Sequence, residues 1–154
     1  MKIKSLMLVT ILFALSQPAL ANRLVNDIQG CQGYMDFIDE KLAKAPAKYP
    51  EADVKNVIKG LDAYDVYIQN QIVTPGLLKF TGGDKAKADA LQKQVDDYKK
   101  TLVKNLHKRY PQPRLFMDHA VSINDCAKKA VPSGQALEDL KLALNTIVKL
   151  SQLN

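Results

Sequence analysis

Three observations predict an all-α fold for this chain, a single-domain bundle of about five helices with short loops. Apolar residues recur every three or four positions over five stretches, which is the spacing of one helix face. Breakers that contain proline or glycine separate these stretches. No stretch shows the strict alternation of apolar and polar residues that is typical of a half-buried strand.

The first segment, residues 1–21, has the layout of a secretory signal peptide. Lys2 and Lys4 precede an apolar run over residues 6–15, and the triplet Ala19-Leu20-Ala21 follows. This run is too short to cross a bilayer, and no later segment is apolar for long enough. We therefore expect cleavage after Ala21, export to the periplasm and no stable membrane insertion.

The mature domain, residues 22–154, begins with two predicted helices. The first spans residues 24–45, before Pro46, and the second starts near Pro50 and reaches Ile72. The breaker Thr74-Pro75-Gly76 is expected to end the second helix. Gly60 lies inside the second helix, where glycine is unfavourable, and it predicts a close helix crossing.

Three more helices are expected after the breaker Thr81-Gly82-Gly83. Asp84 is a favourable N-cap for a helix that continues to Tyr110-Pro111. A fourth helix is predicted over residues 114–131 and a last one over residues 137–151, with Pro132-Ser133-Gly134 between them.

The two cysteines, Cys31 and Cys126, predict a disulfide. An exported chain with an even number of cysteines favours a bond between them, and two cysteines allow one intramolecular pairing. The bond would tie the first mature helix to the fourth; an intermolecular bridge in a homodimer is the alternative.

Charge argues against a nucleic-acid partner. The net charge is +6, and removal of Lys2 and Lys4 with the signal leaves 20 basic residues against 16 acidic ones. Lysines alternate with aspartates along the third helix, which is typical of a solvated helix face rather than a phosphate-binding stripe.

No motif in the chain identifies a catalytic, metal or cofactor site. His107 and His119 lack the spacing of a zinc-binding helix, and no nucleophile elbow or phosphate-binding loop is present. Non-covalent haem would need axial ligands such as Met35 and His119, which are more simply read as core residues. We therefore predict no enzyme and no cofactor.

The stretch Cys31-Gln32-Gly33-Tyr34-Met35, followed by Asp36 and Asp39, resembles the first mature helix of Tai/Rap-type periplasmic immunity proteins. The resemblance implies a non-enzymatic helical protein, often a dimer. It implies a protein partner, a peptidoglycan-cutting amidase delivered by type VI secretion, whose active-site cleft is blocked. This chain departs from the family by its single pair of cysteines and by the helices that follow the third.

Two other classes of function remain open beside the inhibitor. One is a periplasmic chaperone or stress protein, with Tyr64 and Tyr67 beside the apolar residues of 77–80 as a candidate patch. The other is a carrier of haem or another small ligand, with a pocket inside the bundle. For an inhibitor, the predicted partner-contact segment is a loop over residues 74–83, with Thr74, Leu77, Leu78 and Phe80 in contact.

Overall fold

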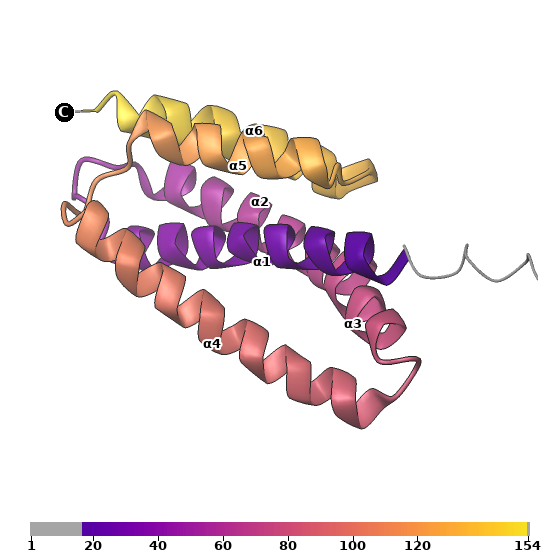
Figure 1. The fold of residues 1–154 in the computed structure, drawn as a ribbon. Coiled ribbons are helices and arrows are strands. Elements are labelled where there is room, and N and C mark those ends of the chain that lie inside the picture. Colours follow the sequence, from indigo (N-terminus) through magenta and orange to yellow (C-terminus); the bar gives the residue numbers. More distant parts are fainter. Residues whose placement is uncertain (1–16, 154) are drawn as a thin grey trace, which may run out of the picture.

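The computed structural model describes residues 17–153, and every regular element in that range is helical (Figure 1). The elements are α1 (Gln17–Leu42), α2 (Glu51–Ile68), η1 (Gln69–Val73), α3 (Thr74–Phe80), α4 (Lys85–Arg109), α5 (Met117–Lys129) and α6 (Gly134–Ser151). Because α2, η1 and α3 follow one another without a break, the described chain forms five helical rods. The predicted all-α bundle is confirmed, whereas the predicted signal sequence lies largely outside the described residues.

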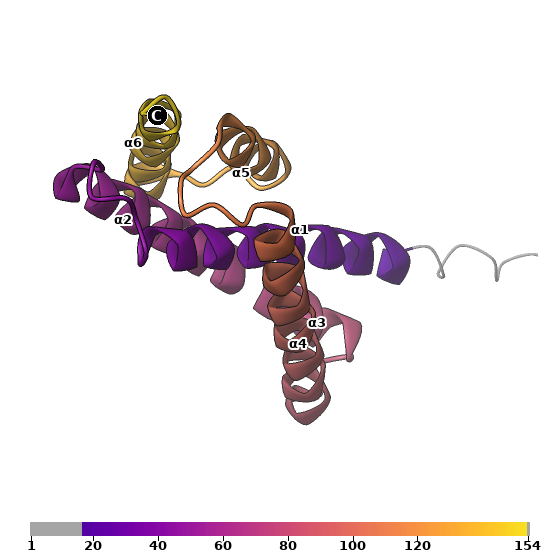
Figure 2. The same ribbon diagram turned by 90° about the vertical axis from the view of Figure 1, so that its left-hand side faces the viewer.

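The helices form three layers with α1 in the middle. The hairpin of α5 and α6 lies on one side of α1 and α2, and α4 crosses α1 on the other side (Figures 1 and 2). Helix α1 contacts α2, α3, α4 and α5, whereas the contacts of α4 are with α1 and α3. One apolar core runs through the bundle, with fully buried side chains such as Ile28, Ile38, Leu61, Ile123 and Ile147.

The predicted close crossing at Gly60 is confirmed. A β-carbon at Gly60 would overlap the backbone carbonyl of Asp139 and would lie 2.6 Å from the β-carbon of Ala143, both on α6. Only a hydrogen fits at this point, so the absence of a side chain lets α2 and α6 pack closely. The fit is less tight at Gly33 on α1, where a β-carbon would lie 3.2 Å from Leu102 Cδ2 and 3.4 Å from the Lys99 α-carbon on α4.

The expected helix stop at Thr74-Pro75-Gly76 was wrong. The helix widens into the π-helix η1, and the Thr74 amide donates to the Gln69 carbonyl five residues earlier. Proline lacks an amide hydrogen and clashes with the carbonyl four residues before it in a regular α-helix. The wider turn displaces that carbonyl, so Pro75 occupies the first turn of α3 and the helix continues.

The other helix ends differ from expectation by a few residues. Helix α1 ends at Leu42, α5 begins at Met117 and α6 begins at Gly134. The predicted N-cap of α4 is confirmed, because the Asp84 carboxylate accepts a hydrogen bond from the Lys87 amide at 3.1 Å.

Candidate partner-binding surface

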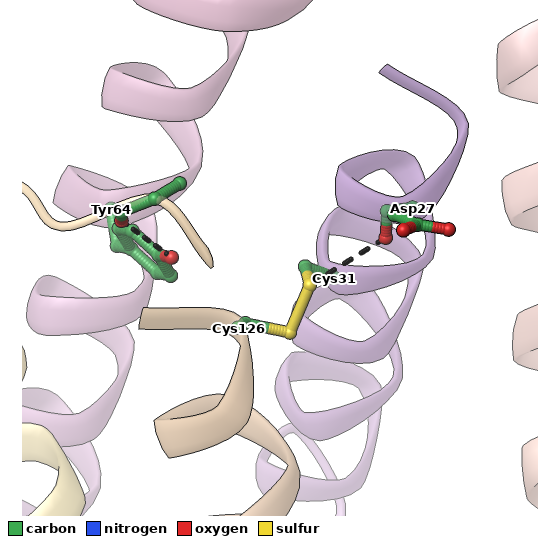
Figure 3. Close-up of a disulfide and its surroundings, with 5 residues drawn as sticks. Asp27, Cys31, Tyr64 and Cys126 are labelled. Carbon is green, nitrogen blue, oxygen red and sulfur yellow. Dashed lines mark hydrogen bonds between the residues drawn. A yellow bond between two sulfur atoms is a disulfide. The ribbon is translucent and has the colours of Figure 1, made fainter. Parts of the chain in front are cut away.

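The predicted disulfide joins α1 to α5. Cys31 and Cys126 are bonded, with their α-carbons 5.8 Å apart, and both side chains are buried (Figure 3). Beside this bond, the Tyr64 hydroxyl on α2 donates to the Ala130 carbonyl after α5 at 2.9 Å. The bond and the tyrosine hold the α5 end of the hairpin against the middle layer, and neither sulfur remains as a free thiol.

The predicted partner-contact segment is helical rather than a loop. Residues 74–80 form α3, Leu77 is buried and Leu78 is half-buried, so these two leucines belong to the core. The Thr74 hydroxyl accepts a hydrogen bond from the Gln69 amide nitrogen at 2.9 Å. Thr74 and Phe80 remain exposed, and 49% of the Phe80 surface is accessible.

Phe80 borders an apolar groove between α1, α3 and α4. The groove has a volume of about 570 Å³. Its lining consists of Asn26, Asp27, Gln29, Leu77, Phe80, Leu91, Gln94, Val95 and Tyr98. Tyr98 on α4 is 51% exposed, so the groove carries one exposed ring on each of two helices.

The tyrosine patch considered for a chaperone does not exist as a surface. Tyr64 is fully buried and Tyr67 is half-buried, and their rings stack with centroids 6.4 Å apart. Both hydroxyls donate to carbonyls at the end of α5, those of Ala130 and Val131. These tyrosines therefore connect α2 to the hairpin, and the Tyr64 ring offers no exposed surface.

His119 is a core residue enclosed by aromatic rings. Its imidazole is fully buried among Tyr34, Phe37, Tyr110 and Phe116, with ring centroids 5.0 to 6.0 Å away. Its Nδ1 accepts the Phe116 amide hydrogen at 3.2 Å. Burial, with the nearby charge of Lys41, lowers the pKa of His119 to about 4, so the ring is neutral at physiological pH.

Lys41 is a buried structural residue that sequence reasoning missed. It is 3% exposed, and its ammonium group donates to the carbonyls of Tyr110, Gln112 and Arg114 in the α4–α5 connection. Burial lowers the pKa of Lys41, and the three acceptors satisfy its three N–H donors. Its position in the sequence could have indicated this burial, because Lys41 lies one helical turn after the buried Phe37 and Ile38.

Carboxyl groups gather where α1 faces α2 and α4. One oxygen each of Asp39 and Asp65 is buried without a hydrogen-bond partner among the described residues. Burial, together with the charges of Asp62, Asp36 and Asp65, raises the pKa of Asp39 to about 7. Burial likewise raises the pKa of Asp36 and of Asp65. Asp39 is therefore partly protonated near neutral pH.

Side-chain amides connect this region to the π-helix. The Gln32 amide donates to Gln69 at 3.2 Å, Gln69 donates to Gln92 at 3.0 Å, and Gln92 donates to Asp96 at 3.0 Å. This series of hydrogen bonds runs from α1 through the first residue of η1 to α4. Sequence periodicity could not reveal it, since the participating residues lie up to 64 positions apart, and only the tertiary structure brings them together.

The chemistry available in this region is limited to proton exchange and charge pairing. A shallow hollow of about 470 Å³ is lined by Asp36, Asp39, Glu40, Asp96, Lys99, Lys100 and Val103. A carboxyl group that titrates near neutral pH can exchange protons, but this lining provides no hydroxyl or thiol nucleophile. In residues 17–153, no group of three or more His, Cys, Asp or Glu side chains is arranged to hold a metal ion.

Comparison with known proteins does not assign the chain to a family. It matches no protein-family model, no curated protein and no solved structure. Over the part of the chain that the structure describes, no helix has both the length and the apolar character needed to cross a membrane.

Proposed function

We propose that the mature chain is an exported, non-enzymatic protein that binds another protein in the periplasm and acts as an inhibitor of the immunity type. The groove between α1, α3 and α4 carries this proposal, with Phe80 and Tyr98 exposed on its two sides. Aromatic side chains are enriched in the energetically dominant centres of protein interfaces. Two half-exposed rings beside an apolar floor match that chemistry.

The groove is held rigidly, which favours binding with little loss of conformational entropy. Leu77 packs into the core three residues before Phe80. After Phe80, the Thr81 hydroxyl donates to a carbonyl of the Leu77–Leu78 turn, at 3.1 Å, and lies 3.0 Å from the Asp84 carbonyl. Phe80 therefore stands on a short helix that is fixed at both of its ends.

The residues that resemble the immunity family pack inside the bundle. They are not the residues that we propose to contact the partner. Cys31, Gln32 and Gly33 are buried, and Tyr34 is half-buried against Phe37 and His119. The resemblance therefore bears on how the first helix packs. The partner-binding role rests on the groove, which lies outside this motif except for the shared helix α1.

Site-specific photocrosslinking in the periplasm tests this proposal. A photoreactive residue in place of Phe80, in the full-length precursor, is expected to give one discrete adduct. The matched control replaces Leu142, which is 48% exposed on α6 in the opposite layer, and should give none. No adduct from position 80, or the same pattern from both positions, contradicts the proposal. A broad ladder of adducts from position 80 favours the chaperone class.

The identified partner then separates an inhibitor from a neutral binder. Its activity should fall as the purified chain is added, with an end point at one chain per partner molecule. The Phe80→Ser/Tyr98→Ser variant is expected to bind about tenfold more weakly or worse, because it removes both exposed rings. A partner that keeps full activity at saturation rules out the inhibitor function.

A further inference from the structure

The positive charge of the mature chain is concentrated in one half of α4. Residues 99–109 contain five basic side chains and no acidic one, whereas residues 85–98 contain three of each. The mature chain has only four more basic than acidic residues, so the rest of it is slightly acidic in sum. The N-terminal half of α4 mixes lysines with aspartates, so the excess of positive charge lies in the C-terminal half.

Three of these lysines form a ridge along the helix, which we call the basic ridge: Lys100, Lys104 and Lys108. They are spaced one turn apart and all three are exposed. Together with Glu40, Val103 and His107 they line a hollow of about 550 Å³. Val103 is buried and forms an apolar floor beneath the lysine side chains.

Ion pairs within the described chain neutralise only one of the three lysines of the ridge. Lys104 and Lys108 form no ion pair with any described residue, and Lys100 pairs with the exposed Asp97 at 3.2 Å. Glu40, the carboxylate in the lining of this hollow, pairs with His107 at 2.7 Å. Like charges one turn apart destabilise a helix, so the spacing of the ridge is unfavourable without an external counter-charge.

Stabilisation of the helix C-terminus explains only some of the basic residues in this half of α4. Basic residues in the last turn interact favourably with the partial negative charge at a helix C-terminus, which explains Lys108 and Arg109. That effect fades within one turn, so it does not explain Lys100 and Lys104. Contacts within the chain do not cover the ridge either, because its three lysines are exposed. Helix α4 packs against α1 and α3, and Figure 2 shows it on the outside of the bundle.

We propose that the basic ridge is the docking surface for an acidic segment of the protein partner, with carboxylates spaced to meet lysines one helical turn apart. This inference rests on the proposed partner-binding function and names the chemistry of the partner. Asp97 and Glu40 lie within or beside the ridge, and the carboxyl cluster of Asp36 and Asp39 adjoins it. These acids would repel a uniform polyanion, such as a nucleic acid or an anionic bilayer, but they suit a protein surface of mixed charge.

Binding of a defined probe to the full mature chain tests the inference. The probe is a synthetic helical peptide with glutamate at every fourth position, and a glutamine version of the same peptide is its control. The acidic peptide should bind at low ionic strength, and the affinity should fall as salt is added. The Lys100→Gln/Lys104→Gln/Lys108→Gln variant should bind about tenfold more weakly, the loss expected for three exposed charge pairs.

A matched variant separates the ridge from net charge. Lys85→Gln/Lys87→Gln/Lys93→Gln removes the same charge from the other half of α4, and it should bind the acidic peptide like the wild type. No binding of the acidic peptide, or an equal loss in both variants, overturns the inference. Tighter binding to vesicles of phosphatidylglycerol and phosphatidylethanolamine, or to duplex DNA, also overturns it because the partner class would be wrong.

The Phe80 adduct distinguishes failure of this inference from failure of the proposed function. If the adduct forms equally well with the ridge variant at low and high salt, the partner does not use the ridge, and the proposed function stands. If no adduct forms at position 80 while the acidic peptide binds to the ridge, the proposed groove fails instead.

Discussion

Asp39 shows how one side chain makes the stability of the bundle depend on pH. Its pKa is about 7 in the folded chain and near 3.8 when unfolded, because burial and neighbouring carboxylates disfavour the charged form. A raised carboxyl pKa means that the folded chain holds a proton which the unfolded chain releases. Its contribution to stability is therefore present below about pH 4 and is lost as the pH rises through about 7.

The variant Asp39→Asn is expected to remove this loss. At about pH 8 the variant should be more stable than the wild type by about 2 kcal/mol, and near pH 4 the two should be similar. Urea unfolding at several pH values measures the difference. His119 acts in the opposite sense, because its lowered pKa costs stability as the pH falls from about 6.5 to 4, but it is common to both proteins and cancels.

An exposed carboxylate provides the control for Asp39. The variant Asp125→Asn removes the same charge from a side chain of α5 that pairs with Lys128 at the surface. Its stability should follow the wild type to within about 0.5 kcal/mol at each pH. If Asp39→Asn keeps the pH dependence of the wild type, Asp39 does not control it.

At the scale of elements, the contact between α2 and α6 depends on Gly60. Gly60→Ala places a β-carbon into the Asp139 carbonyl and close to Ala143, so the two helices must separate. The loss of packing should exceed the better helix propensity of alanine, for a net destabilisation of about 2 kcal/mol. Thermal unfolding followed by circular dichroism measures the effect.

Gly30 on α1 is the matched control for this packing effect. A β-carbon there meets nothing within 4 Å, so Gly30→Ala should stabilise the protein by about 0.5–1 kcal/mol through helix propensity alone. Two glycine-to-alanine changes inside helices are thus expected to have opposite signs. A stable Gly60→Ala variant would show that α2 and α6 tolerate a wider crossing.

At the scale of the whole molecule, the disulfide connects residues 95 positions apart. The variant Cys31→Ala/Cys126→Ala should keep its helical circular dichroism and lose about 3 kcal/mol of stability, since closure of so long a loop restricts the unfolded chain by at most about 4–5 kcal/mol. Wild-type protein unfolded with a reductant present should match it. A stability equal to the oxidised wild type contradicts the role of this bond as a clamp.

The fold was predictable wherever the signal is local. The periodicity of apolar residues predicted the helices, and Asp84 marked the start of α4 correctly. The misread point, Pro75, follows a π-helix, and the widening of a helix has no local sequence signature. The prediction of an exposed loop over residues 74–83 failed for a related reason. Because the helix continues through Pro75, Leu77 faces the core instead of the solvent.

The sequence by itself determined an all-helical bundle, because helical periodicity is a property of neighbouring residues. It reduced the disulfide to one intramolecular bond or a bridge between two copies, and the structure shows the intramolecular bond. Only the tertiary structure decided the burial of Lys41, the neutral state of His119 and the raised pKa of Asp39. It also decided which lysines remain without a partner on α4. These properties depend on desolvation and on charges contributed by helices far apart in the sequence, and a one-dimensional pattern does not contain those distances.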